Sequence, residues 1–140
     1  MAATDRYRQH HNELDALFNK VVHQLHNPVG DKWAHDTTRL LSEFTARLST
    51  HLSVEDNTLY PNLLASGHAD LVRMATHYKA EMGNLYGSYM DFWKRWRSAA
   101  LLQKDTGDFL KEARAIFSTL RARIEREDRE LYPLADRVLH

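Results

Sequence analysis

Hydrophobic and polar positions alternate along this chain with the period of an α-helix. Apolar side chains recur at steps of three and four residues in four long segments, at about 5–26, 40–59, 69–103 and 108–131. The second segment is expected to end or bend near Pro61, because proline disrupts the interior of a helix. No stretch shows the competing alternation of a β-strand. The pattern therefore predicts four long amphipathic helices.

Turn-forming residues separate these segments. Glycine and proline are scarce, and Pro28, Gly30, Gly67 and Gly107 fall at three expected chain reversals, at 27–31, 66–68 and 104–107. Short connections between long helices favour antiparallel neighbours. We therefore predict an all-α fold, an up-down-up-down four-helix bundle, with residues 1–140 forming a single domain.

The overall charge and hydropathy exclude several classes of partner. The 19 basic and 19 acidic side chains cancel, which leaves no net field to attract nucleic acid or an anionic membrane surface. No stretch approaches the roughly 18 uninterrupted apolar residues of a membrane-spanning helix, and the first residues lack the apolar core of a signal peptide. We expect a cytoplasmic protein without a nucleic-acid or membrane partner.

The supply of metal ligands is restricted to nitrogen and oxygen. The chain has no cysteine, so it offers neither disulfides nor thiolate ligands, but it has nine histidines. Histidine is abundant enough to justify a search for ligand spacing, although exposed histidines are common.

Polar residues interrupt two of the apolar stripes. His51 and Glu55 are four residues apart and so share one helix face. An imidazole and a carboxylate together suit iron, whereas the plainer alternative is a weak surface pair. The residues after this pair recur near the C-terminus: segments 51–61 and 123–133 share Glu, Asp, Leu, Tyr and Pro at the same spacing, and Glu127 is the second glutamate. This repeat indicates an internal duplication.

The repeated motif, with its Leu-aromatic-Pro ending on the second and fourth helices, resembles the hemerythrin-like (HHE cation-binding) family over nearly the whole chain. There is some further similarity to the iron-cluster-repair di-iron branch. The resemblance implies a non-haem di-iron site between the helices, with Glu55 and Glu127 as bridging carboxylates. It also implies a histidine early in the first helix, matched by His11 with His10 as its rival, and one early in the third helix, matched by His77.

The sequence departs from the family at Arg123, where a histidine ligand is expected. A guanidinium stays protonated and has no lone pair to donate to a metal. One alternative is that Glu81, one turn beyond His77, completes the ligand set. A second is a single metal held by His51, Glu55 and either His77 or His11.

A third alternative removes the metal altogether. Arg123 could form an ion pair with Glu55 or Glu127 and so leave a bundle without metal. Tyr60 and Tyr132, which follow the two glutamates, are expected to pack with their polar tips rather than to act as ligands.

The function that the resemblance implies is binding of one or two non-haem irons, with oxygen, nitric oxide or iron itself bound or sensed. The alternatives are an oxidase or peroxidase-like di-iron enzyme, and a metal-free bundle that acts through protein contacts along its third helix. We favour a binding protein over an enzyme. The sequence does not decide between a monomer and a homodimer.

Overall fold

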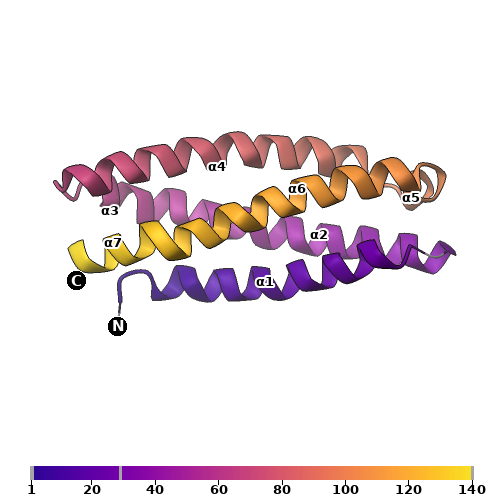
Figure 1. The fold of residues 1–140 in the computed structure, drawn as a ribbon, viewed down its shortest axis with the longest axis horizontal. Helices are drawn as coiled ribbons and strands as arrows, with labels where there is room; N and C mark the ends of the chain where they lie inside the picture. Colours follow the sequence, from indigo (N-terminus) through magenta and orange to yellow (C-terminus); the bar gives the residue numbers. More distant parts are fainter. Residues whose placement is uncertain (1, 29, 140) are drawn as a thin grey trace.

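Four long helices lie side by side in the computed structural model, which describes residues 2–28 and 30–139 (Figure 1). They are α1 (Asp5–His26), α2 (Gly30–Val54), α4 (Ala69–Arg95) and α6 (Thr106–Arg126). Consecutive long helices run in opposite directions, and the N- and C-terminal ends of the chain lie at the same end of the bundle. The described residues contain no β-strand. The predicted all-α, up-down-up-down bundle is confirmed.

The second and fourth helices do not stop at their prolines. Each passes through a π-helical segment, η1 (Glu55–Leu59) or η2 (Glu127–Leu131), and continues as a short helix, α3 (Tyr60–Leu64) or α7 (Tyr132–Val138). Both short helices lie at the end of the bundle that carries the chain termini (Figure 1).

The π-helical segments have a local cause in the repeated motif. In the first copy, the backbone N–H of Tyr60 donates to the carbonyl of Glu55, five residues back instead of four. The next residue, Pro61, has no N–H, and in an α-helix its ring would clash with the carbonyl four residues earlier. A wider turn relieves this conflict and changes the direction of the side chains before the proline. Each π-helical segment begins with the glutamate of its motif.

The third helix is shorter than predicted. We expected it to reach Gln103, but α4 ends at Arg95, and a separate helix α5 (Ala99–Lys104) follows. Leu102 of α5 is completely buried, and α5 packs against α2. The apolar spacing therefore continues through the chain reversal, because both sides of the turn face the core. The last long helix begins at Thr106, two residues before the predicted start.

The apolar core is divided into two parts by a layer of polar side chains. The larger apolar cluster includes Leu14 and Leu52, and the smaller one, near α3 and α7, includes Tyr7 and Leu59. His11 follows Tyr7 and precedes Leu14 on α1, so the change of cluster occurs at this level of the helix. Burial of these two apolar clusters supplies the main stabilisation of the bundle.

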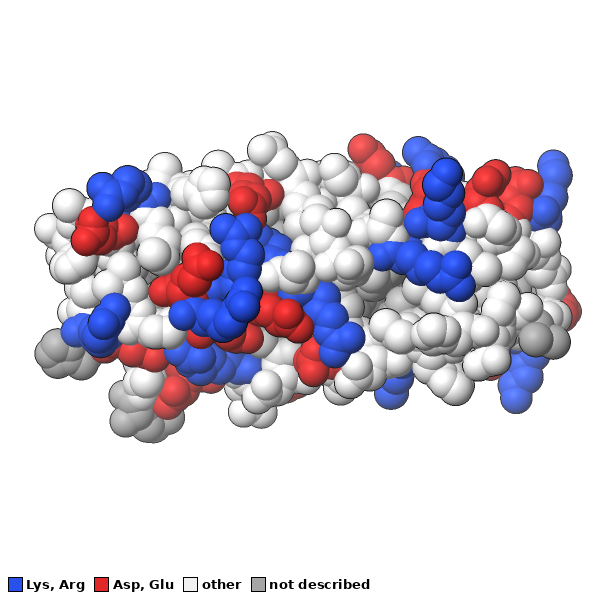
Figure 2. All heavy atoms as spheres, in the orientation of Figure 1, with Lys and Arg blue, Asp and Glu red and all other residues white. Residues whose placement is uncertain are grey.

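Charges of both signs are mixed on the surface. On the face shown in Figure 2, basic and acidic side chains lie next to one another over much of the bundle. One such pair joins Arg121 to Asp15 at 2.7 Å, and another joins Arg8 to Asp136 at 3.3 Å. Among the described residues, no helix is both long and apolar enough to cross a membrane.

Candidate metal centre

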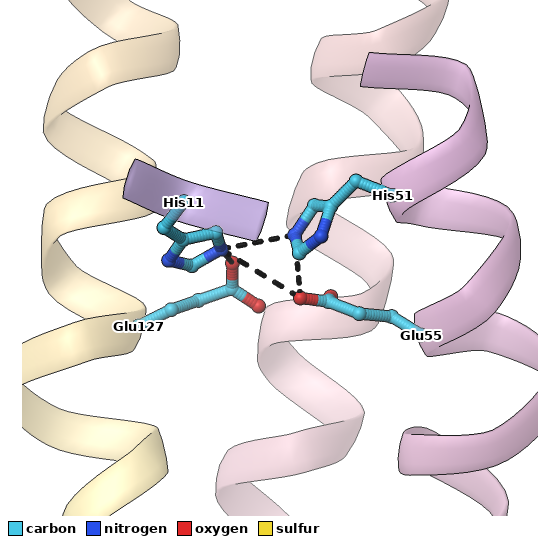
Figure 3. Close-up of side chains that lie close together, drawn as sticks. All are labelled: His11, His51, Glu55 and Glu127. Carbon is cyan, nitrogen blue, oxygen red and sulfur yellow. Dashed lines mark hydrogen bonds and ion pairs between the residues drawn. The ribbon is translucent and has the colours of Figure 1, made fainter. Parts of the chain in front are cut away.

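Four side chains of the polar layer point toward one another in the middle of the bundle (Figure 3). They are His11 of α1, His51 of α2, Glu55 at the start of η1 and Glu127 at the start of η2. Each offers one ligand atom, and these atoms all lie within 4.8 Å of one another. We call these four residues the central cluster. Their side chains are at most 3% exposed.

The two imidazole rings direct the same atom, Nε2, to the centre of the cluster. His11 Nε2 lies 2.9 Å from His51 Nε2, and His51 Nε2 lies 2.7 Å from Glu55 Oε1. His11 Nε2 also lies 3.8 Å from Glu55 Oε1 and 3.5 Å from Glu127 Oε1. Two nitrogen and two carboxylate donors thus converge on one point.

The outer nitrogens of both rings have partners of their own. His11 Nδ1 lies 2.9 Å from a carboxylate oxygen of Asp128, which accepts its N–H. Such a partner fixes the tautomer and leaves Nε2 free to donate a lone pair. His51 Nδ1 lies 3.3 Å from His10 Nδ1. His10, the rival candidate, is therefore a neighbour of the central cluster, and His11 is the helix-one histidine inside it.

Two tyrosines connect the copies of the repeated motif. The hydroxyl of Tyr132 donates to Glu55 Oε1 at 2.5 Å, and the hydroxyl of Tyr60 donates to Glu127 Oε2 at 2.8 Å. Both side chains are buried. They pack as expected, but their polar tips hold the two carboxylates in place. The recurrence of Leu-Tyr-Pro after each glutamate was the signal for this role.

The charges of the central cluster depend strongly on one another. Burial by itself lowers the pKa of His11, but the hydrogen bond to Asp128 and the nearby carboxylates of Glu127 and Glu55 outweigh it and raise the pKa to about 11. Burial by itself raises the pKa of Glu55, but the nearby imidazoles of His11 and His51 bring it well below the usual range. Burial and the nearby Glu55 raise the pKa of Glu127. These opposite pKa shifts favour a proton on His11 and a negative charge on Glu55.

Arg123 fills the bundle beside this cluster. Its side chain is 2% exposed, and its Nε lies 2.7 Å from Glu81 Oε1. Its Nη2 donates to the backbone carbonyl of Tyr78 at 2.7 Å, and the guanidinium lies 4.0 Å from the centre of the Tyr78 ring. The distance from Nη1 to Glu127 Oε1 is 4.0 Å. Arg123 therefore pairs most closely with Glu81, and its ion pair with Glu127 is longer, at 4.0 Å, than the hydrogen-bonded fork that the metal-free alternative proposed.

The structure does not bring the two helix-three candidates into the cluster. The His77 side chain is 64% exposed, and its Nε2 lies 3.2 Å from Glu81 Oε2. Glu81 is one-third exposed and pairs with Arg123 and, at 3.3 Å, with Arg126. The buried positions in this part of α4 include Tyr78 and Met82, and one residue along a helix turns a side chain by about 100°. His77 therefore lies off the inward face.

The donor atoms of the central cluster lie close enough together to hold a metal ion. Ligand atoms about 2.1 Å from a metal lie about 3 to 3.5 Å from one another, close to the spacing of the four donor atoms. Oε1 of Glu127 is buried and has no hydrogen-bond partner among the described residues. A cation at the centre would satisfy this oxygen and would take the place of the proton on His11. The set of two nitrogens and two carboxylates, without sulfur, suits first-row transition metals.

The architecture and the site together define a class of protein, namely helical bundles that place imidazole and carboxylate groups at one level of the core. The chain matches the family model described as the Hemerythrin HHE cation binding domain over residues 2–135, and it belongs to that family. Comparisons with curated proteins and with solved structures give no match. Family membership and the buried His–Glu group agree on metal binding as the role of the site.

Proposed function

We propose that this protein binds one non-haem iron ion per chain through the central cluster, and that the iron binds or senses a small ligand such as oxygen or nitric oxide. The observation that carries the proposal is the convergence of four donor atoms from three segments of the bundle within 4.8 Å. Two imidazoles with carboxylate oxygens are the ligand set of many non-haem iron sites, and such sites keep open positions. Iron would supply reversible binding of a diatomic molecule at such a position.

Charge supports one ion rather than the two that the resemblance implies. The two carboxylates of the cluster balance one ferrous ion. A second ion would add at least two further positive charges beside the buried guanidinium of Arg123. Uncompensated buried charge is strongly unfavourable. Helices three and four contribute the packed pair of Tyr78 and Arg123 beside the cluster, and a guanidinium cannot serve as a ligand for a second ion.

The chain's own residues prepare the site before a metal arrives. Asp128 orients His11, and the tyrosine hydroxyls hold one oxygen of each glutamate. Ligands held in this way lose little conformational freedom when they bind an ion, which favours affinity.

Elemental analysis of untagged protein tests the proposal directly. After anaerobic loading with ferrous iron, the wild-type chain should retain about one iron, and His51→Ala should retain little while keeping its helical circular dichroism, because the apolar clusters stabilise the bundle. His35→Ala is the matched control, since the His35 side chain is on the same helix and 63% exposed. Equal iron in His51→Ala and His35→Ala would refute the assignment, and no iron in the wild type would leave a metal-free bundle.

A further inference from the structure

A cavity of about 430 Å³ lies against the central cluster, between α2 with η1 on one side and α4 on the other. Glu55 and Tyr60 are buried residues of its wall, and Leu52, Met82 and Tyr86 add apolar surface. Gly83 also lines this space, which we call the Gly83 cavity. Its wall therefore includes a residue of the proposed metal site.

The Gly83 cavity is much larger than a diatomic ligand needs. One water occupies about 30 Å³ in the liquid, so the cavity has room for roughly ten times that volume or more. Its size lies within the range of about 300 to 1,000 Å³ that is usual for small-molecule sites. The combination of an apolar wall with a few polar groups is also typical of such sites.

The charges around the cavity favour an uncharged occupant. Asp56 and Lys79 contribute one charge of each sign, whereas the buried carboxylate of Glu55 is already paired with His51. An organic anion would meet Asp56, and an organic cation would meet Lys79. Ser53 and Asn57 also line the cavity and offer hydrogen-bonding groups. The side-chain amide nitrogen of Asn57 donates to the hydroxyl of Ser53 at 3.3 Å. A neutral molecule with one polar group avoids the electrostatic cost and can use these partners.

We propose that the Gly83 cavity binds a small, uncharged organic molecule, about the size of one ring and carrying a hydroxyl or a similar hydrogen-bonding group. The molecule lies beside Glu55, and its position next to a metal ion rests on the proposed function. Gly83 contributes no side chain to the wall. A Cβ atom built on Gly83 meets no other atom within 4 Å, so a larger side chain has room to enter without disturbing the helix.

A matched pair of variants isolates the cavity. Gly83→Leu should fill it, whereas Gly87→Leu changes the next turn of the same helix, outside the cavity. A Cβ atom on Gly87 also meets nothing within 4 Å. Both variants should fold, because neither glycine has a positive φ and leucine is the better helix former.

The test is a titration of the metal-free protein, residues 1–140, with phenol, followed by NMR of methyl-labelled methionine. The Met82 signal should shift saturably, whereas the signal of Met90, which lies outside the cavity, should not. Gly83→Leu should weaken phenol binding at least about tenfold, and Gly87→Leu should not. Benzoate should bind more weakly than phenol. No saturable Met82 shift, equal affinity in the two variants, or tighter binding of benzoate would overturn the proposal.

Iron-loaded protein separates this inference from the function on which it rests. A paramagnetic ion in the central cluster should broaden the signals of bound phenol in the wild type. Phenol that shifts Met82 in a protein unable to bind iron would support the cavity and reject the proposed function. Iron binding without any effect of phenol on the Met82 signal would support the proposed function and reject the cavity as a binding site. Bound phenol that iron does not broaden would show that the occupant does not lie beside Glu55.

Discussion

Tyr132 donates a hydrogen bond of 2.5 Å to Glu55, although 77 positions separate the two residues. Tyr60 makes the reciprocal bond to Glu127 at 2.8 Å. Each copy of the repeated motif therefore provides the tyrosine that holds the glutamate of the other copy. This exchange ties the second and fourth helices together at the level of the proposed metal.

Tyr132→Phe should destabilise the metal-free protein by about 1 to 3 kcal/mol, because it removes a hydrogen bond to a buried, ionised carboxylate. Urea unfolding gives the free-energy difference. The control is Tyr86→Phe, which removes a bond of 2.5 Å between two half-buried hydroxyl groups, of Tyr86 and Ser49. Tyr86→Phe should lower the free energy of unfolding by less than Tyr132→Phe, since neither of these hydroxyl groups is charged. A smaller loss in Tyr132→Phe than in Tyr86→Phe would contradict the role assigned to Tyr132.

Asp128→Asn should weaken metal binding about 10- to 100-fold, because an amide is a poorer acceptor than a carboxylate for the Nδ1–H of His11. Competition with a chelator measures the affinity. The matched control is Asp56→Asn at the equivalent position of the first motif copy, where the described structure shows no hydrogen bond to either cluster histidine. The prediction fails if both variants lose affinity to the same extent.

Arg123→His alone should leave the iron content near one per chain. The new imidazole would restore a donor on the fourth helix, but the third helix presents Tyr78 at this level and keeps His77 at the surface. The double variant Arg123→His with Tyr78→His should approach two irons, because both inward positions then carry imidazole. Elemental analysis distinguishes these results, and a gain from Arg123→His alone would show that His77 or Glu81 can turn inward.

Stability should fall as the pH rises above about 10. Burial raises the pKa of Tyr89 above its usual value near 10, while its hydrogen bond with Thr45 opposes this effect. A pKa that is higher in the folded state gives stability that is complete below the unfolded pKa and is lost as the pH approaches the folded pKa. Urea unfolding at several alkaline pH values should show a shallower loss in Tyr89→Phe than in the wild type. Identical slopes would exclude Tyr89 as a source of the alkaline loss.

The sequence by itself determined the helical class, the order of the long helices and the position of the repeated motif. These features follow from local periodicity, since apolar residues at steps of three and four have one stable arrangement, with the stripes facing inward. The same reliance on spacing explains why the end of α4 before Trp96 was not predicted. Leu102 continues the apolar spacing after the chain has turned. Spacing alone also placed His51 and Glu55 on one helix face.

Only the tertiary structure decided which side chains meet. His77 and Tyr78 are neighbours in sequence, yet the structure exposes the first and buries the second. The pairing of Arg123 with Glu81, and the exchange of tyrosines between the motif copies, join residues that are far apart in the chain. One residue along a helix rotates a side chain by about 100°. The register of each helix against its neighbours therefore decides which polar groups enter the core, and that register is set by the packing of the whole bundle.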